Sequence, residues 1–155
     1  MTSAELARKL AEQHTTYRLL RHPHTERATD EAAALGLPPE EIGKTLVLAH
    51  DDRFLRAVLP ASERLDLRKL RALPSVGAAV RLASEAEIGA RYSMFELGAV
   101  PPFGGPDGDA VVVDRRIAER DSVIVEAGSH EESIQMTVRD LLALTGAQVA
   151  DICLD

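Results

Sequence analysis

Short apolar runs and amphipathic stretches alternate along the whole chain, and each predicts a short element of secondary structure. Apolar residues spaced three and four positions apart predict helices, whereas continuous or alternating apolar runs predict strands. Helices are expected over residues 3–13, 30–35, 62–73 and 138–144, with another starting at Ser84 and a helical turn between strands at 111–113 and 123–125. The remaining strands are expected over residues 17–20, 43–50, 54–59, 78–82, 134–136 and 149–153. Because strands and helices are interspersed, the pattern predicts a mixed-sheet α+β or α/β domain.

Polar residues mark where three of these helices should begin. Thr29 is placed to cap the second helix, and Thr137 is placed to cap the last one. Ser84 and Glu87 have the spacing of a capping box, in which each side chain bonds to the backbone of the other residue.

One long segment, residues 98–109, contains too much glycine and proline for regular structure. Its conformationally special residues are Gly98, Pro101, Pro102, Gly104, Gly105, Pro106 and Gly108. Long loops in compact domains are commonly binding loops. We therefore expect this segment to take part in function.

The composition is that of a globular protein rather than a fibrous or disordered one. The 155 residues are 45% hydrophobic and 28% charged, which predicts one domain over residues 1–155. No apolar run approaches the ~18 residues of a membrane span, and the amphipathic N-terminus is not that of a secretory signal. The single cysteine, Cys153, cannot form an internal disulfide or a thiolate zinc site, so we expect a cytoplasmic protein.

The charge balance is acidic, with 18 basic against 25 acidic side chains and a formal net charge of −7. Sequence-independent binding of a nucleic-acid duplex depends on neutralising many phosphates, so this balance argues against it. A small basic patch could still bind one nucleic-acid end. The best local cluster of cations is Arg64, Arg68, Lys69 and Arg71. Lysine is scarce, because only Lys9, Lys44 and Lys69 occur among the 18 basic residues.

Lys44 is the first candidate for chemistry, because it stands at the head of the most apolar strand. An ammonium group in that position is expected to be partly desolvated. It can then bind a carboxylate, a carbonyl oxygen or a phosphate, or stabilise negative charge that develops at a carbonyl. The alternative is a side chain that extends from a strand end into solvent.

Two glycine-containing loops are the other candidates. In residues 98–104, two glycines bracket a Pro-Pro pair, and Val100 and Phe103 can anchor the loop to the core. A loop stiffened in this way can hold backbone N–H groups in a fixed direction, as an oxyanion cradle requires. In the second loop, Gly128 follows an apolar strand and lets a ligand approach the backbone. The alternative to a functional role is a structural crossover for the first loop and a plain hairpin turn for the second.

The sequence contains none of the common metal, nucleotide or nucleophile motifs. The five histidines are scattered, and no HExxH, CxxC, GxGxxG or GxSxG pattern is present. The tripeptide at 43–45 resembles the end of a phosphate loop, but Pro38 stands where that loop has its first glycine. We therefore predict no bound metal and no cofactor.

Taken in order, the motifs resemble those of the YbaK/EbsC/ProX-like aminoacyl-tRNA deacylases, which are free-standing relatives of the editing domain inserted in bacterial prolyl-tRNA synthetases. The resemblance covers roughly residues 15–152. The stretches that carry it are Ile42-Gly-Lys-Thr-Leu-Val-Leu48, Leu59-Pro60, Leu65-Asp-Leu-Arg-Lys-Leu70, Arg81-Leu-Ala83, Gly98-Ala-Val-Pro-Pro102, Val112-Val-Asp114, Ala127-Gly-Ser129 and Asp140-Leu-Leu142. Their order and spacing, rather than any single motif, make the match specific.

The resemblance implies a barrel-like, mostly antiparallel mixed sheet surrounded by helices. It implies hydrolysis of the ester between a wrong, small amino acid and the terminal ribose of a tRNA, with the proline tRNA as one candidate. Lys44 matches the family's essential lysine, and Gly98 matches the start of the loop that positions the substrate carbonyl and the attacking water. The substrate-binding positions implied by the same match are Thr45, Ala99, Val100, Pro101, Pro102, Phe103, Gly104, Gly128, Ser129 and Ser133. No metal and no covalent nucleophile is implied.

The implied partners are the acceptor end of an aminoacyl-tRNA and, as a second candidate, an aminoacyl-tRNA synthetase. Some alanine-specific relatives carry asparagine where this chain has Thr45, and cysteine-specific relatives carry aspartate where it has Ser133. The amino acid removed is therefore left open, as is the choice between monomer and homodimer. Two other hypotheses stay open: a non-catalytic module that binds an amino acid, an RNA end or a synthetase, and a hydrolase of small esters without tRNA.

Overall fold

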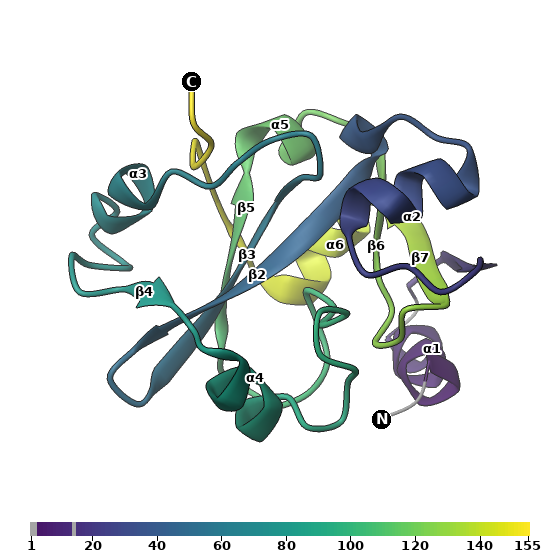
Figure 1. Cartoon of the computed structure of the whole chain (residues 1–155), viewed down its shortest axis with the longest axis horizontal. Helices are drawn as coiled ribbons and strands as arrows, with labels where there is room; N and C mark the ends of the chain where they lie inside the picture. Colours follow the sequence, from purple (N-terminus) through teal and green to yellow (C-terminus); the bar gives the residue numbers. More distant parts are fainter. Residues whose placement is uncertain (1–2, 14) are drawn as a thin grey trace.

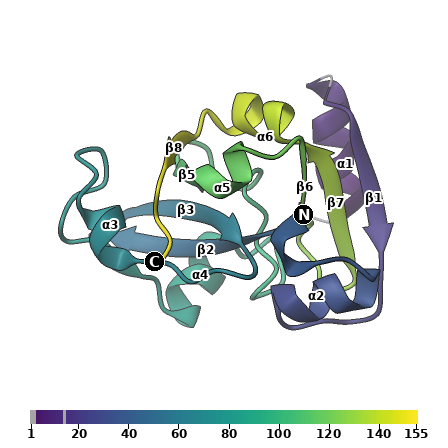
Figure 2. The ribbon, with the colours of Figure 1, turned by 90° about the horizontal axis from the view of Figure 1, so that it is seen from above.

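The computed structural model describes residues 3–13 and 15–155 (Figure 1). The helices are α1 (Ser3–Glu12), α2 (Ala28–Leu35), α3 (Leu67–Arg71), α4 (Glu85–Arg91), α5 (Arg115–Ala118) and α6 (Val138–Thr145), with a short 3-10 helix, η1 (Pro39–Glu41). The strands are β1 (Tyr17–Arg21), β2 (Ile42–His50), β3 (Arg53–Pro60), β4 (Arg81–Leu82), β5 (Ala110–Asp114), β6 (Ser122–Glu126), β7 (Glu132–Thr137) and β8 (Gln148–Ala150). Figure 2 shows α3 at one end of the β2–β3 hairpin and α1 and α2 at the end of the molecule that contains β1 and β7.

The strands of the described chain form one mixed sheet. Its order is β1-β7-β6-β2-β3-β5-β8, and β4 pairs with β2 off this path. The pairs β1–β7, β6–β7, β2–β3 and β2–β4 are antiparallel, whereas β2–β6, β3–β5 and β5–β8 are parallel. The predicted mixed, mostly antiparallel α/β class is therefore confirmed. The expected barrel-like closure is not seen, because the terminal strands β1 and β8 do not pair with each other in the described sheet.

The sheet has a gap along one edge of β2. β6 pairs with β2 only at Ile42 and Gly43, and β4 pairs with it only at Leu48 and Ala49. Figure 1 shows the two short partners at opposite ends of the long strand. The middle of β2 therefore has a strand partner on one side only, which is β3.

One residue of β2, Thr45, has its backbone N–H and C=O directed into this gap, because hydrogen bonds alternate along the β2–β3 pair. The amide of Ala61 donates to the carbonyl of Ile42 at 2.8 Å, so even-numbered positions of β2 bond to β3 and odd-numbered positions point away from it. Pro60, which has no N–H, accordingly lies opposite an odd-numbered position, Gly43. Thr45 therefore presents its backbone N–H and C=O to the gap between β6 and β4.

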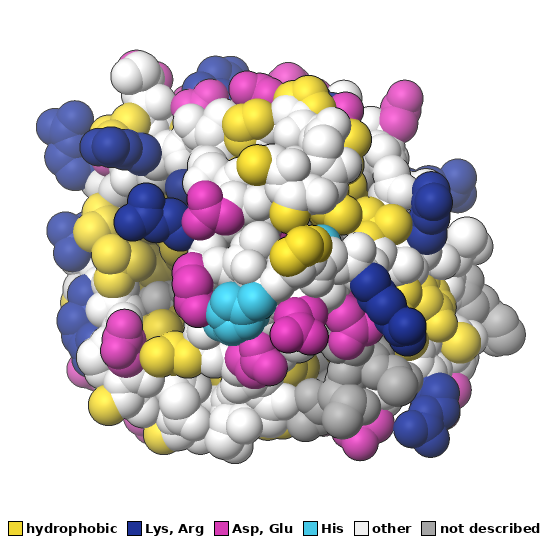
Figure 3. Space-filling view, turned by 45° about the vertical axis from the view of Figure 1, so that its right-hand side comes forward, with side chains coloured by type: hydrophobic (Ala, Val, Ile, Leu, Met, Phe, Trp, Pro, Cys, Tyr) yellow, Lys and Arg dark blue, Asp and Glu magenta, His cyan; other side chains and the backbone are white. Residues whose placement is uncertain are grey.

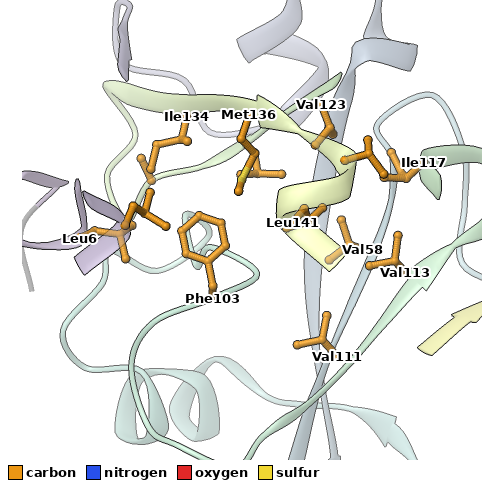
Figure 4. Close-up of a cluster of buried hydrophobic side chains, with 14 residues drawn as sticks. Leu6, Val58, Phe103, Val111, Val113, Ile117, Val123, Ile134, Met136 and Leu141 are labelled. Atoms are coloured by element: carbon orange, nitrogen blue, oxygen red, sulfur yellow. The ribbon is translucent and has the colours of Figure 1, made fainter. Parts of the chain in front are cut away.

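Apolar side chains on both faces of the sheet fix the strands that border the gap. The largest cluster packs α1, α5 and α6 against β3, β5, β6 and β7, and Phe103 from the long loop enters it (Figure 4). On the opposite face, Leu70 of α3 packs against β2, β3 and β5. Ala32 of α2 packs against the parallel pair Ile42 and Ile124.

Most of the predicted elements are confirmed, including the β2–β3 hairpin and two of the predicted helix caps. Ser84 and Glu87 form the predicted capping box at the start of α4, and the side chain of Thr137 accepts from the amide of Asp140 at the start of α6. The prediction for Thr29 is wrong, because α2 begins two residues earlier than expected, at Ala28, and its N-cap is Arg27, without a side-chain bond.

The helix predicted over residues 62–73 is wrong in its first half. Helix α3 begins only after Asp66, whose carboxylate accepts from the amides of Arg68 and Lys69 and so caps the helix. Leu65 instead forms an isolated antiparallel bridge with Cys153, and its apolar side chain packs against the core cluster on this face of the sheet. The strand expected over residues 78–82 is likewise confined to β4, because β2 offers it only two paired positions.

No helix in the described part of the chain is both long and apolar enough to cross a membrane.

Candidate functional site

A pocket of about 330 Å³ opens at the gap between β4 and β6. Its walls come from the unpaired edge of β2, the region of β4 and α4, the loop at 98–100, the end of β6 and the segment before α2. The lining residues are Glu26, Ala28, Lys44, Thr45, Leu46, Val47, Leu82, Ala83, Ile88, Gly98, Val100 and Glu126. Because side chains alternate along a strand, Lys44 reaches the pocket from one face of β2, and Thr45 and Val47 reach it from the other.

Lys44 contributes an unpaired positive charge to this pocket. The side chain is half-buried, and no described residue forms a hydrogen bond or an ion pair with its ammonium group. Burial lowers the pKa of Lys44, and the positive charge of Arg64 lowers it further. Because it has no carboxylate partner, the ammonium is available to bind negative charge on a ligand.

Thr45 contributes polar groups from the strand edge. Its hydroxyl oxygen is buried and has no hydrogen-bond partner among the described residues. Its backbone N–H and C=O point into the gap, as the β2–β3 alternation requires. A ligand that enters the pocket can therefore bond to an unpaired strand edge as well as to Lys44.

The loop at Gly98 forms another wall of the pocket and is held in place by the loop that follows β6. Gly98 has φ +87°, a conformation that residues with a side chain rarely adopt. The amide of Gly128 donates to the carbonyl of Ala99 at 3.0 Å, and His130 Nε2 donates to the carbonyl of Leu97 at 2.7 Å. These bonds fix the direction of the backbone groups around Gly98.

Glu126, the last residue of β6, also lines the pocket. The parallel register places Gly43 opposite Val125, so Lys44 and Glu126 occupy the next position on each strand, where the two strands separate. Both side chains therefore start from the same face of the sheet, and no ion pair between them is formed.

Two buried polar side chains stand behind Glu126. Glu31 of α2 and Ser133 of β7 are both almost fully shielded from solvent, and Ser133 lies directly opposite Glu126 in the β6–β7 ladder. The Ser133 hydroxyl is hydrogen-bonded to the Glu31 carboxyl group and, at 2.8 Å, to Nε2 of His22. Burial raises the pKa of Glu31, and burial together with the charge of Glu31 raises the pKa of Glu126 to about 9. The carboxyl pair therefore retains at least one proton at neutral pH.

Replacing Glu126 by glutamine should flatten the pH dependence of stability. The pKa of Glu126 is about 9 in the folded protein and 4.5 as an ordinary glutamate, so the folded state holds an extra proton between these pH values. The contribution of this proton to the free energy of unfolding is fully present below pH 4.5 and is lost as the pH rises towards about 9. As the pH rises across this window, the free energy of unfolding of the wild type should fall relative to that of Glu126→Gln. The expected fall is up to about 1.4 kcal/mol per pH unit. Urea unfolding of both proteins at several pH values measures the difference, and parallel curves would contradict the buried, protonated state.

The structure brings four of the residues predicted for the site into the pocket: Lys44, Thr45, Gly98 and Val100. Four others do not line the pocket: Ala99 and Pro101 belong to the same loop as Gly98, and Gly128 and Ser129 belong to the loop after β6. Ala99 accepts from Gly128, as described above, and the carbonyl of Pro101 accepts from Nη1 of the buried Arg56 at 2.9 Å. Ser129 accepts from the amide of Glu131 at 3.1 Å.

Pro102, Phe103 and Gly104 line a separate cleft of about 220 Å³ between the long loop and α1. Phe103 is buried in the largest core cluster, which confirms the expectation that it anchors the loop (Figure 4). Ser133, the remaining residue, lies in the buried network with Glu31 rather than on the pocket surface.

The basic cluster predicted from the sequence is divided. The ammonium group of Lys69 donates to the carboxylates of Asp151 (3.2 Å) and Asp155 (2.8 Å) and to the carbonyl of Cys153 (2.7 Å), so it serves to hold the C-terminal segment. Arg64 is exposed, and its charge reaches Lys44. Figure 3 shows one face of the molecule on which acidic side chains and histidine gather near the centre, with Lys and Arg nearer the edges.

One group of histidine and acidic side chains in the described chain is close enough to share a cation. The ligand atoms of His24, Glu26 and His130 lie within 4.8 Å of one another. His24 Nε2 is already hydrogen-bonded to Glu26 at 2.5 Å, and His130 Nε2 is bonded to Leu97. Because each imidazole already uses a ring nitrogen within the protein, we assign no metal to this group.

Sequence reasoning missed the acidic wall of the pocket. Glu126 follows an apolar strand and resembles an ordinary solvated strand end, and Glu31 lies in the first turn of a helix, where acids are common. The one available signal was the spacing of Glu126 from Gly128, which places it at the start of a predicted binding loop.

Comparisons with known proteins show the family and the fold of this chain. A family model described as "Aminoacyl-tRNA editing domain" matches residues 22–144. The crystal structure of the hypothetical protein APE2540 is similar over 97% of this chain and 99% of that chain, with a TM-score of 0.87 and 29% sequence identity. A structure described as that of a proposed trans-editing enzyme for prolyl-tRNA synthetase is similar over 100% of this chain and 99% of that chain, with a TM-score of 0.85 and 28% identity.

The same fold also occurs within a longer protein. A structure described as that of a proposed signal transduction protein from Marinobacter aquaeolei VT8 is similar over 97% of this chain but 31% of that chain, with a TM-score of 0.70. At 19% identity, this likeness shows the fold alone.

Proposed function

The chain belongs to the aminoacyl-tRNA editing domain family, and on that premise we propose that it hydrolyses the ester between a wrong, small amino acid and the terminal ribose of a tRNA. The observation that carries the proposal is the meeting of Lys44, the edge of β2 at Thr45 and the Gly98 loop in one pocket. This is the pocket that an ester substrate requires: one cation and oriented backbone groups beside a largely apolar wall.

The proposed mechanism assigns a role to each group. Lys44 stabilises the negative charge that develops on the carbonyl oxygen or holds a nearby phosphate, and the backbone at Gly98 orients the carbonyl and the attacking water. An aminoacyl ester is already activated, so this electrostatic help is sufficient without a metal or a covalent nucleophile. Thr45, Val100 and the neighbouring apolar side chains contact the amino acid.

Discrimination in the proposed reaction depends on size. An apolar pocket distinguishes one methylene group by only about 1–3 kcal/mol, so synthetases that activate small amino acids depend on a second site that removes errors. The volume of about 330 Å³ also has to admit the terminal ribose, which favours a small side chain in the remaining space.

The proposed partner is the acceptor end of an aminoacyl-tRNA. The acidic net charge of −7 favours weak and local contact. The proposed contacts are two exposed cations, Arg64 just before α3 and Arg68 within it. Affinity should fall with salt, with a shallow slope because few phosphates are touched. A synthetase that makes the error is the second proposed partner, and the proposed compartment is the cytoplasm. We also propose that residues 1–155 form one domain.

A deacylation screen tests the proposal. A panel of mischarged tRNAs, including proline tRNA carrying small amino acids, is incubated with the purified protein and with buffer alone. We expect at least one member to lose its amino acid faster than in buffer, with a rate proportional to enzyme concentration. Hydrolysis of the whole panel at the buffer rate would contradict the proposal. Binding without hydrolysis would favour a binding module, and turnover of small esters without tRNA would favour a general esterase.

A further inference from the structure

The proposed reaction calls for a proton donor, because ester cleavage expels a ribose oxygen that is strongly basic until it is protonated. We infer that Glu126 delivers this proton as the C–O bond breaks, and that Glu31, Ser133 and His22 form the hydrogen-bonded path through which it regains one. The inference rests on the proposed deacylase function and adds to it a catalytic residue and a set of positioning residues.

The position of Glu126 suits this role. It lines the pocket together with Lys44 and Gly98, and it stands on the same sheet face as Lys44 at the point where β2 and β6 separate. A carbonyl held between Lys44 and the Gly98 loop therefore has the carboxyl group of Glu126 on the same pocket wall, within the space that the ribose must occupy.

The surroundings of Glu126 keep a proton on it. Glu31 from α2 interacts with it directly, and Ser133 of β7 lies opposite it in the ladder. Lys44 from β2 and Glu26 line the same pocket. Burial raises its pKa first, and the charge of Glu31 adds to the effect. Lys44 forms no ion pair that would favour the carboxylate. A carboxylic acid kept neutral at physiological pH by such surroundings is the usual form of a general acid.

The other acid in the pocket does not meet this requirement. Glu26 is exposed, and its hydrogen bond with His24 lowers its pKa. It is therefore ionised at neutral pH and has no proton to give. Glu31 is protonated more readily than an ordinary glutamate, but it does not line the pocket.

The path behind Glu126 can carry a proton in either direction. His22 Nδ1 bonds to the carbonyl of Pro23 at 2.8 Å, and because a carbonyl only accepts, Nδ1 carries a proton. In neutral His22, Nε2 then accepts from the Ser133 hydroxyl, whose oxygen accepts from protonated Glu31. In charged His22, Nε2 donates to Ser133, and Ser133 donates to the Glu31 carboxylate. Both arrangements satisfy His22, Ser133 and Oε2 of Glu31. Oε1 of Glu31 is buried without another partner, and the hydrogen bond between Glu31 and Glu126, which raises the pKa of Glu126, completes the path for proton transfer.

The oxygen of water adds to the carbonyl carbon, and the bond between that carbon and the ribose oxygen breaks. The proton of Glu126 ends on the ribose oxygen, and the proton lost by water passes to solvent. One proton then returns from solvent through His22, Ser133 and Glu31 to Glu126. One water is consumed, and the products are the free amino acid and the free ribose hydroxyl.

The leaving group provides the sharpest test. A short RNA that carries the amino acid as its normal ester is compared with one in which sulfur replaces the leaving ribose oxygen. A thiol has a pKa near 8.5, so its thiolate leaves without a proton from the enzyme. We expect Glu126→Gln to slow single-turnover cleavage of the ester about 100-fold or more, with KM changed by less than about 3-fold, and to slow the thioester less than about 5-fold.

Two matched variants keep the test specific. Lys44→Ala should slow both substrates, because both develop charge on the carbonyl oxygen, and Glu119→Gln, at an exposed position, should slow neither. Glu31→Gln should shift the fall of the rate at high pH to a lower pH, because it removes the charge that holds the proton on Glu126. A purely structural role for Glu31 would leave that pH unchanged.

Either of two results would overturn the inference: ester cleavage by Glu126→Gln within about 3-fold of the wild-type rate, or equal slowing of ester and thioester. A wild-type protein that cleaves neither substrate would overturn the proposed function itself, whereas a wild-type rate that falls with Lys44→Ala but not with Glu126→Gln overturns only the role of Glu126.

Discussion

Lys44→Ala should reduce the rate of deacylation by about 100- to 1,000-fold, the usual loss when one electrostatic stabiliser of an oxyanion is removed. The side chain lies in the pocket without a carboxylate partner, so its charge serves no ion pair of the fold. We therefore expect little change in the melting temperature. Single-turnover deacylation and thermal unfolding of the same preparation separate the two effects.

The scarcity of lysine offers a matched control. Lys9 is exposed on α1, away from the pocket at the β2 edge, and Lys9→Ala should retain the wild-type rate. Lys69 is unsuitable as a control, because its three bonds hold the C-terminal segment. Equal rates for Lys44→Ala and the wild type would remove Lys44 from the mechanism.

Gly98→Ala should lower the rate of deacylation by about 100-fold, because a displacement of about 1 Å in a positioning group costs that much. A side chain at φ +87° is strained, and a Cβ atom there would lie 3.2 Å from Cε1 of His130. Relief of this close contact requires the loop or the imidazole to move, and the imidazole is held by its hydrogen bond to the carbonyl of Leu97. Kinetics at saturating substrate should show the loss mainly in kcat.

Gly77→Ala is a control that separates the effect of backbone strain from the effect of moving the Gly98 loop. Gly77 has φ +95°, but nothing lies within 4 Å of a Cβ built there. Both variants should lose about 1–2 kcal/mol of stability from the left-handed backbone, and only Gly98→Ala should lose activity. If both variants deacylate at the same rate, the geometry of the Gly98 loop does not matter for the reaction.

The elements that carry the pocket could be predicted from the sequence because their signals are local. The apolar run of β2 and the Asp-Asp-Arg turn after it predict the hairpin, and the glycines and prolines of 98–109 exclude regular structure. The meeting of Lys44 with Gly98 came from the family resemblance rather than from periodicity, because these residues are distant in sequence.

Other features depend on tertiary pairings that no local pattern contains. The leucines of residues 62–73 have helical spacing, yet Leu65 pairs with Cys153 near the other end of the chain and Asp66 starts the helix anew. Ser133 was expected at the substrate and is instead buried beside Glu31, because α2 covers that end of the sheet. The gap in the sheet follows from the short contacts of β2 with β4 and β6, which the strand pattern does not specify.

The central claim is that the gap between β4 and β6 binds the aminoacyl end of tRNA with its carbonyl between Lys44 and the Gly98 loop. A crystal structure with an adenosine that carries the amino acid through a stable amide in place of the ester tests this most directly. We predict that the carbonyl oxygen lies within hydrogen-bond distance of Lys44 Nζ or of the backbone around Gly98, with the amino acid against Thr45 and Val100. Binding in the cleft between Phe103 and α1, or a carbonyl turned away from both Lys44 and Gly98, would contradict the account.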